Sequence, residues 1–172
     1  VELRQFDFNA SHDEEAGILP MIRGARQLTQ ARGYELRLIA CPWSPPFWMK
    51  MPRSGTVGMA SPTMEMPREG NRTMRHSAVP NGLDPQFQMP YAKYLSDFLT
   101  AYESKGAAVW GLSVQNEVEN PSDQWEACVY TPEFMNSFVA DYLAPVLRER
   151  HPDVKLFGYD HNKDHMVRWA KA

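Results

Sequence analysis

Residues 107–120 read AAVWGLSVQNEVEN, and this stretch decides how the rest of the chain is interpreted. Its first eight residues, from Ala107 to Val114, are almost entirely apolar. Such a run is typical of a strand that is buried on both faces of a parallel sheet, and we interpret Trp110 within it as a packing residue. The next six residues, from Gln115 to Asn120, are mostly amides and carboxylates. The stretch therefore predicts a buried strand whose carboxyl end carries polar side chains.

Two further apolar runs, at residues 35–41 and 154–159, predict buried strands of the same kind. Segments with apolar residues at helical spacing alternate with the three strands. These helices are expected at residues 11–33, at 91–106, from 131 past 145, and at 164–171.

Local signals mark several helix boundaries. Ser11 and Glu14 match a capping box at the start of the first helix, and Pro20 must lie in a first turn or at a kink. Thr131 is expected to cap the third helix, and Pro145 to kink its last turns.

Strict alternation of helices and apolar strands predicts an α/β fold with a parallel sheet and right-handed crossovers, either doubly wound or a (β/α) barrel. Three strands cannot close either architecture. A (β/α)₈ barrel needs about 250 residues, whereas the chain has 172. If the fold is a barrel, the whole of 1–172 is a partial catalytic domain that holds roughly three of eight units.

The composition of the chain limits the classes of ligand that it is expected to bind. Lys and Arg number 18 and Asp and Glu 21, giving a net charge of −3 without a basic run. This balance provides no electrostatic footprint for nucleic acid or an anionic membrane surface. The sequence contains no apolar stretch of about 18 residues, the length that would predict a membrane span. We therefore expect a small or neutral ligand and no nucleic-acid partner.

The two cysteines, Cys41 and Cys128, form no CxxC pattern and are too few for a disulfide framework. We expect free buried thiols, although the two could approach each other. The first eight residues lack the features of a signal peptide. Asn9 and Asn71 begin Asn-x-Ser/Thr tripeptides, which would be glycosylation acceptors in a secretory protein.

Residues 49–90 form a long stretch rich in Met, Pro and Gly, without helical or strand periodicity. A stretch of this length is expected to be a functional loop or a disordered one. It follows the carboxyl end of a predicted strand, where the active sites of barrels are built. A solvated insertion without a role is the equally weighted alternative.

Polar and aromatic residues follow each predicted strand: CPWSPPFWMK at 41–50, QNEVEN at 115–120 and DHN at 160–162. In a parallel α/β fold these strand ends converge on one face. Carboxylates and amides there suit the hydroxyl groups of a sugar, and indole rings suit its apolar face. A sugar-binding cleft is therefore predicted, either in an enzyme or in a binding scaffold without turnover.

A metal-dependent hydrolase is the rival enzyme class. His161 and His165 have the i, i+4 spacing of a metal-binding pair, and Asp160 and Asp164 lie beside them. No HExxH motif accompanies them. We therefore predict no metal and no cofactor.

The segments LRLIACPWSPPFWMK (36–50), VWGLSVQNEVEN (109–120), CVYTPEF (128–134) and VKLFGYDHN (154–162) resemble family 30 glycoside hydrolases, the glucosylceramidase group. Several independent motifs occur in the family's order over most of the chain. Cys41 stands where the family usually has Ser, and Val118 where it usually has Pro. The resemblance implies a (β/α)₈ TIM barrel, of which this chain would hold about strands 3 to 5 with their flanking helices.

The resemblance also implies roles for individual residues. Glu117 matches the general acid/base of the family, Asn116 the amide that holds the sugar 2-hydroxyl, and Trp43 an aromatic wall of the subsite. The family's nucleophile is a second Glu on the seventh strand, beyond residue 172, and Glu119 is interpreted as a loop carboxylate. The full set of expected substrate-binding residues is Asn116, Trp43, Trp48, Gln115, Asp160 and His161.

The implied activity is that of a retaining β-glycosidase acting on β-glucosides such as glucosylceramide. Such an enzyme uses two carboxylic acids about 5 Å apart, one as acid/base and one as nucleophile. Membrane contact is then expected only through a lipid-linked substrate. The family resemblance implies a lysosomal or secreted location. The segment alone is predicted to be inactive, because it lacks the nucleophile.

Overall fold

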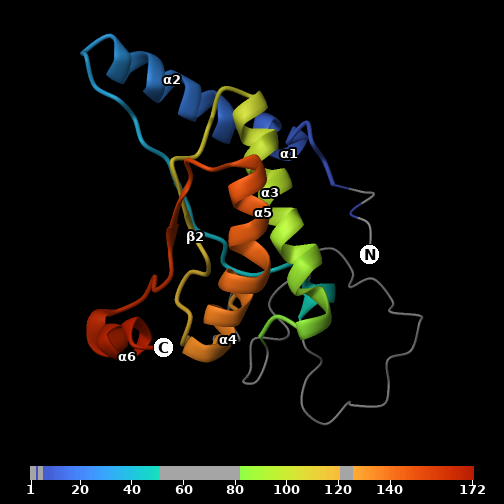
Figure 1. Ribbon diagram of the computed structural model, residues 1–172. Coiled ribbons are helices and arrows are strands. Elements are labelled where there is room, and N and C mark those ends of the chain that lie inside the picture. Colours follow the sequence, from blue (N-terminus) through green and yellow to red (C-terminus); the bar gives the residue numbers. More distant parts are fainter. Residues whose placement is uncertain (1–2, 4–5, 51–81, 121–125) are drawn as a thin grey trace.

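The computed structural model describes residue 3 and residues 6–50, 82–120 and 126–172 (Figure 1). Three parallel strands form one sheet in the order β1-β2-β3, comprising β1 (Ile39–Ala40), β2 (Gly111–Ser113) and β3 (Lys155–Phe157). Ile39 pairs with Gly111, which in turn pairs with Lys155. The predicted parallel sheet is confirmed, with the 107–114 stretch supplying the central strand. Each strand is shorter than its apolar run.

The helices alternate with the strands as predicted. They are α1 (Ser11–Glu15), α2 (Ile18–Gln30), η1 (Phe47–Met49), η3 (Pro85–Phe87), α3 (Gln88–Ser104), α4 (Pro132–Phe138), η4 (Val139–Leu143), α5 (Ala144–Arg150), η5 (Lys163–His165) and α6 (Met166–Ala170). None of the helices in the described segments is long and apolar enough to cross a membrane.

The first predicted helix is two helices, because the chain turns at Gly17, which has a left-handed φ of 80°. The predicted capping box of Ser11 is wrong. Ala10 is the N-cap residue of α1, and the Asp7 carboxylate accepts the backbone N–H of Ser11 at 2.7 Å instead. Asp7 can do this because the left-handed backbone at Ala10 turns the chain back towards it. Pro20 lies in the first turn of α2, where its missing N–H leaves no bond unmade.

The boundaries of the third helix follow the prediction closely. Thr131 caps α4, and its hydroxyl accepts the N–H of Phe134 at 3.2 Å. Ahead of Pro145 the helix widens into the π-helical segment η4, and Ala144 donates its N–H to the carbonyl of Val139, five residues back. A proline has no N–H to donate to the preceding turn, so the irregular turn at this place has a local cause.

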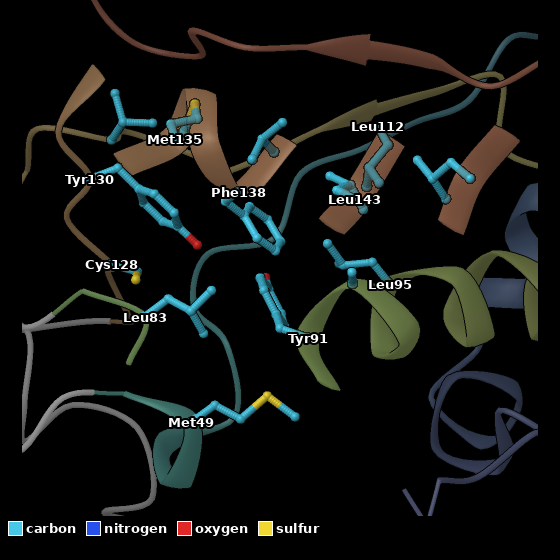
Figure 2. Close-up of a cluster of buried hydrophobic side chains, with 14 of the residues drawn as sticks. Met49, Leu83, Tyr91, Leu95, Leu112, Cys128, Tyr130, Met135, Phe138 and Leu143 are labelled. Atoms are coloured by element: carbon cyan, nitrogen blue, oxygen red, sulfur yellow. The ribbon is translucent and has the colours of Figure 1, made fainter. Parts of the chain in front are cut away.

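The hydrophobic core lies between the sheet and the helices. In Figure 1, α3 and α5 run side by side along one face of the sheet. Leu112 of β2 points into a cluster that includes Tyr91 and Leu95 of α3, and Phe138 and Leu143 of the α4–η4 segment (Figure 2). The rings of Tyr91 and Phe138 stack with their centroids 5.8 Å apart. This one-sided core holds β2 in place and thereby positions its carboxyl end.

The prediction that all three strands are buried on both faces holds only for β2. Ile39 in β1 is 54% exposed, and Phe157 in β3 is 37% exposed. Strand side chains alternate between the two faces, and these two belong to the face away from the core. In the described part of the chain that face has no complete second layer. The ring of Phe157 instead lies over Gly111, where a Cβ atom would be only 2.6 Å from it.

Residues 51–81, most of the predicted long loop, lie outside the described residues. Its two ends meet. Lys50 and Leu83 form an antiparallel bridge, and Asp84 donates its N–H to the carbonyl of Met49 at 2.9 Å. Met49 and Leu83 are both buried at the edge of the core (Figure 2). Helix α3 begins at Gln88, so the last residues of the predicted loop are helical.

Candidate active site at the strand ends

The polar segments after the three strands meet, as the parallel arrangement predicts. Asn116 and Asp160 form a parallel bridge beyond the ends of β2 and β3. The N–H of Asn116 donates to the carbonyl of Pro42 at 3.0 Å, and the N–H of Glu117 donates to the carbonyl of Asp160 at 2.7 Å. The segment after β1 therefore holds the backbone of Asn116, and the segment after β3 holds the backbone of Glu117.

Glu117 has an unusual backbone conformation. Its φ is 47°, and Ala10 is the only other non-glycine residue in the described segments with a positive φ. A side chain in this region costs roughly 1–2 kcal/mol, so the surrounding structure must supply the compensating contacts. Such strain is concentrated at functional sites. The conformation thus marks Glu117 independently of its sequence motif.

The sequence analysis missed Asn120 as a residue of the site. Its backbone N–H donates to the carbonyl of Glu117 at 2.9 Å, and its amide Nδ2 donates to Glu117 Oε2 at 2.6 Å. The available signal was the spacing of three residues within the turn after the strand. One carboxylate oxygen of Glu117, Oε2, is thus engaged within its own turn.

Two of the predicted binding residues have clearly different environments. The Trp43 side chain is 52% exposed, as an aromatic wall of a sugar site requires. Gln115 is completely buried, and its Nε2 donates to the carbonyls of Trp43 and Asn116, each at 2.8 Å. This geometry gives Gln115 a structural task, joining the ends of β1 and β2. Contact of Gln115 with a substrate stays a prediction that the geometry does not support.

Trp48 lies in η1 beside the core, with its ring edge-on to Phe87 at 5.5 Å between centroids. This contact favours packing, and substrate binding by Trp48 stays a prediction. Asp160 and His161 follow β3 and are partly buried. Asp160 Oδ2 and His161 Nδ1 are buried without a hydrogen-bond partner among the described residues.

The two cysteines are free. Cys128 is buried as expected, and that burial raises the pKa of its thiol to about 12. Cys41 is exposed overall, which corrects the expectation of a buried thiol. Partial burial of its sulfur and the neighbouring carboxyl of Asp160 raise its pKa to about 11. Both thiols are therefore protonated near neutral pH.

Glu119 is a loop carboxylate, as the sequence analysis interpreted it. It accepts hydrogen bonds from Trp169 Nε1 at 3.0 Å and His165 Nδ1 at 2.8 Å, and Tyr159 Oη lies 3.3 Å from its Oε2. Burial acts to raise the pKa of Glu119, but these hydrogen bonds outweigh it and hold the pKa below its ordinary value.

The predicted metal pair is not placed on one turn of a helix. His165 ends the short helix η5, whereas His161 precedes that helix. The ring Nδ1 of His165 is engaged by Glu119. Within residues 6–50, 82–120 and 126–172, no group of three or more His, Cys, Asp or Glu side chains is arranged to hold a metal ion.

A cavity of about 650 Å³ lies at the opposite, amino-terminal ends of β1 and β2, and Arg37 and Trp110 help to line it. The Arg37 guanidinium lies 5.0 Å from the centre of the Trp110 ring, and that ring contacts Phe157. The packing interpretation of Trp110 is therefore supported. In barrels the active site is built at the other end of the strands, where Glu117 lies.

The chain belongs to glycosyl hydrolase family 30, because the family's TIM-barrel domain matches residues 2–172. The parallel sheet and its helices are thus part of a TIM-barrel fold. The chain is 30% identical to an endo-1,6-beta-D-glucanase of Neurospora crassa over 129 residues, which cover 75% of the chain and 23% of that protein. It is 30% identical to the putative glucosylceramidase 3 of Caenorhabditis elegans over an alignment of 174 positions, which covers 95% of the chain and 29% of that protein.

Among solved structures, SrfJ from Salmonella typhimurium matches with a TM-score of 0.71 and 30% identity. The match covers 94% of this chain and 30% of SrfJ. The chain thus spans less than a third of the length of each of these three relatives.

Proposed function

We propose that the protein to which this chain belongs is a retaining β-glycosidase acting on β-glucosides, with Glu117 as its general acid/base. The observation that carries the proposal is the position of Glu117 beyond the end of the central strand, in a strained conformation held by the segment after β3. Membership of glycosyl hydrolase family 30 supports the reaction class. The chain's three units are taken to be about strands 3 to 5 of the barrel.

In the first step, Glu117 Oε1 donates its proton to the oxygen of the leaving group while a second carboxylate attacks the anomeric carbon. The N–H of Asn120 on Oε2 stabilises the carboxylate that this transfer leaves on Glu117. In the second step, Glu117 takes a proton from water, and that water releases the sugar from the nucleophile. The second carboxylate is expected from a later strand of the barrel, as the family resemblance implies.

Four of the predicted residues, Trp43, Asn116, Asp160 and His161, would bind the sugar. The exposed ring of Trp43 is suited to stack on an apolar sugar face. Asn116 would hold the 2-hydroxyl, and Asp160 and His161 border the same strand ends. The relatives are named an endo-1,6-beta-D-glucanase and a putative glucosylceramidase. The substrates in both names contain a glucosyl unit. We therefore assign the β-glucosyl unit to the site and propose a glucosylceramide-like substrate, with a lysosomal or secreted location.

The test replaces Glu117 by Gln in the full-length protein and compares a dinitrophenyl β-glucoside with an alkyl β-glucoside. Dinitrophenolate leaves without protonation, whereas the alkoxide requires it. The variant should lose far more kcat/KM on the alkyl substrate, because kcat/KM reports the first step, in which only the alkyl leaving group needs the proton. Azide should restore turnover of the aryl substrate, whose second step lacks its base, and give a β-glucosyl azide. Glu149→Gln, on an exposed face of α5, is the matched control.

Equal losses on both substrates would contradict the acid/base assignment. A wild-type protein that binds β-glucosides without turning either over would show a carbohydrate-binding scaffold, the alternative function.

A further inference from the structure

The turn that carries Glu117 is attached to the next unit of the fold at two points. One is the backbone bond from Glu117 N–H to the carbonyl of Asp160. The other is the carboxylate of Glu119, two residues further on, which accepts side-chain hydrogen bonds from His165 and Trp169. These two donors belong to η5 and α6. Figure 1 shows α6 beyond the end of β3, on the same side of the molecule as α4.

The two donors divide the two oxygens of Glu119 between them, Trp169 Nε1 donating to Oε1 and His165 Nδ1 to Oε2. A carboxylate has no proton to give, so Nδ1 of His165 carries the hydrogen of this bond. Tyr159 Oη lies 3.3 Å from Oε2 but donates its one proton to the carbonyl of Asn162 at 2.7 Å, and its ring contacts that of Trp169 at 5.2 Å between centroids. The side chain of Glu119 is 22% exposed and that of His165 is 59% exposed, so the Trp169 bond is the better shielded of the two.

This second attachment matters because the turn is not an intrinsically favourable one. Glu117 occupies the left-handed region, which is unfavourable for a residue with a side chain and which a free loop would leave by rotating. A rotation about the Glu117 backbone would move its carboxyl group away from the position set by Asn120. Hydrogen bonds to a charged carboxylate are stronger than those between neutral groups, so the bonds of Glu119 oppose this rotation.

We propose that Glu119 is a positioning residue for Glu117, and that it works by clamping the turn after β2 to His165 and Trp169. The role rests on the proposed function of Glu117 as the acid/base. Glu119 itself touches neither substrate nor the reacting atoms. It restricts the backbone of the turn, so that Oε1 of Glu117 stays where a leaving oxygen can be protonated.

The test uses Glu119→Ala in the full-length protein, with the exposed Glu149→Ala as the matched control. A misplaced acid is expected to lower kcat/KM on an alkyl β-glucoside by about 10- to 100-fold. The loss of kcat/KM on a dinitrophenyl β-glucoside, whose first step needs no proton, should be much smaller. Loss of folded protein alone would lower both rates equally and leave their ratio unchanged, so the ratio separates positioning from stability.

Milder variants cover the case in which Glu119→Ala does not fold. Trp169→Phe and His165→Phe each remove one donor to Glu119 and keep an aromatic ring. Each should shift the ratio of the two rates in the same direction by a smaller factor. Folded variants that keep the wild-type ratio would overturn the proposal.

A second measurement keeps the clamp testable if Glu117 proves not to be the acid/base. Hydrogen exchange at the Glu117 amide reports on its bond to Asp160 without any turnover. Glu119→Ala should speed this exchange at least about tenfold relative to the amide of Leu112 in β2. An unchanged exchange rate refutes the clamp. Faster exchange, in a protein whose Glu117→Gln variant shows no preference for leaving group, refutes the acid/base role alone.

Discussion

The left-handed backbone of Glu117 leads to a prediction about stability that does not depend on the enzyme's substrate. We compare Glu117→Ala with Glu117→Gly, two variants that both lack the carboxyl group and its bond to Asn120. They differ in how well the new residue tolerates a φ of 47°. Alanine keeps a cost of roughly 1–2 kcal/mol in this region, while glycine has none. Glycine instead adds about 0.5–1 kcal/mol of chain entropy to the cost of folding.

The difference between these two costs predicts that Glu117→Gly is more stable than Glu117→Ala by about 0.5–1 kcal/mol. The neighbouring Asn116 is the matched control, because it does not have a positive φ. There the order should reverse, with alanine the more stable by about 0.5–1 kcal/mol. The glycine-minus-alanine difference in stability should therefore have opposite signs at the two positions, and the two differences should lie about 1–2 kcal/mol apart.

Denaturant titration of the four full-length variants measures these differences, through the midpoint and slope of each unfolding curve. The Glu117 pair should separate with glycine at the higher midpoint, and the Asn116 pair with alanine at the higher midpoint. The same order at both positions would show that residue 117 stores no backbone strain. The account of a strained turn that needs a clamp would then fail with it.

Three further predictions concern the core, the sugar site and the isolated chain. Tyr91→Phe should leave the free energy of unfolding unchanged or raise it by about 1 kcal/mol, because the buried Tyr91 hydroxyl has no hydrogen-bond partner among the described residues. A clear decrease in the free energy of unfolding, measured by denaturant titration, would show that the hydroxyl does have a partner. Trp43→Ala should weaken binding of a glucose-like inhibitor and leave the melting temperature unchanged, since stacking alone contributes about 0.5–1.5 kcal/mol to such binding. A lower melting temperature with normal inhibitor binding would instead show that Trp43 is a packing residue. Residues 1–172 expressed alone should be inactive on β-glucosides and should aggregate on size-exclusion chromatography, because β1 and β3 are sheet edges with exposed Ile39 and Phe157. A monomeric, cooperatively melting fragment would contradict that last prediction.

Elements that depend on nearby residues could be predicted from the sequence. The Thr131 cap, the irregular helix ahead of Pro145 and the first-turn position of Pro20 all follow from interactions within about five residues. The capping box at Ser11 failed although it is equally local. Asp7 satisfied the Ser11 amide first, because a left-handed residue at Ala10 turned the chain towards it.

The candidate site divides in the same way. Its place at the strand ends was predictable, since parallel strands bring their carboxyl ends together. The tasks of individual side chains were less so. Gln115 resembles a ligand-binding amide in the sequence, but its side chain is buried between strand ends. The partners of Glu119 lie 46 and 50 residues away along the chain, at a distance where no periodicity or motif indicates contact.

The sequence by itself determined the alternation of helices and apolar strands, the parallel sheet that follows from it, and the position of Glu117 directly after the central strand. These properties depend on residue types and spacing along a short stretch of chain. Only the tertiary structure decided that Glu117 adopts a left-handed backbone, that Glu119 binds His165 and Trp169, and that one face of the sheet stays exposed at Ile39. Each of these depends on how separate segments pack against one another, and the free energy of that packing overrides local preference.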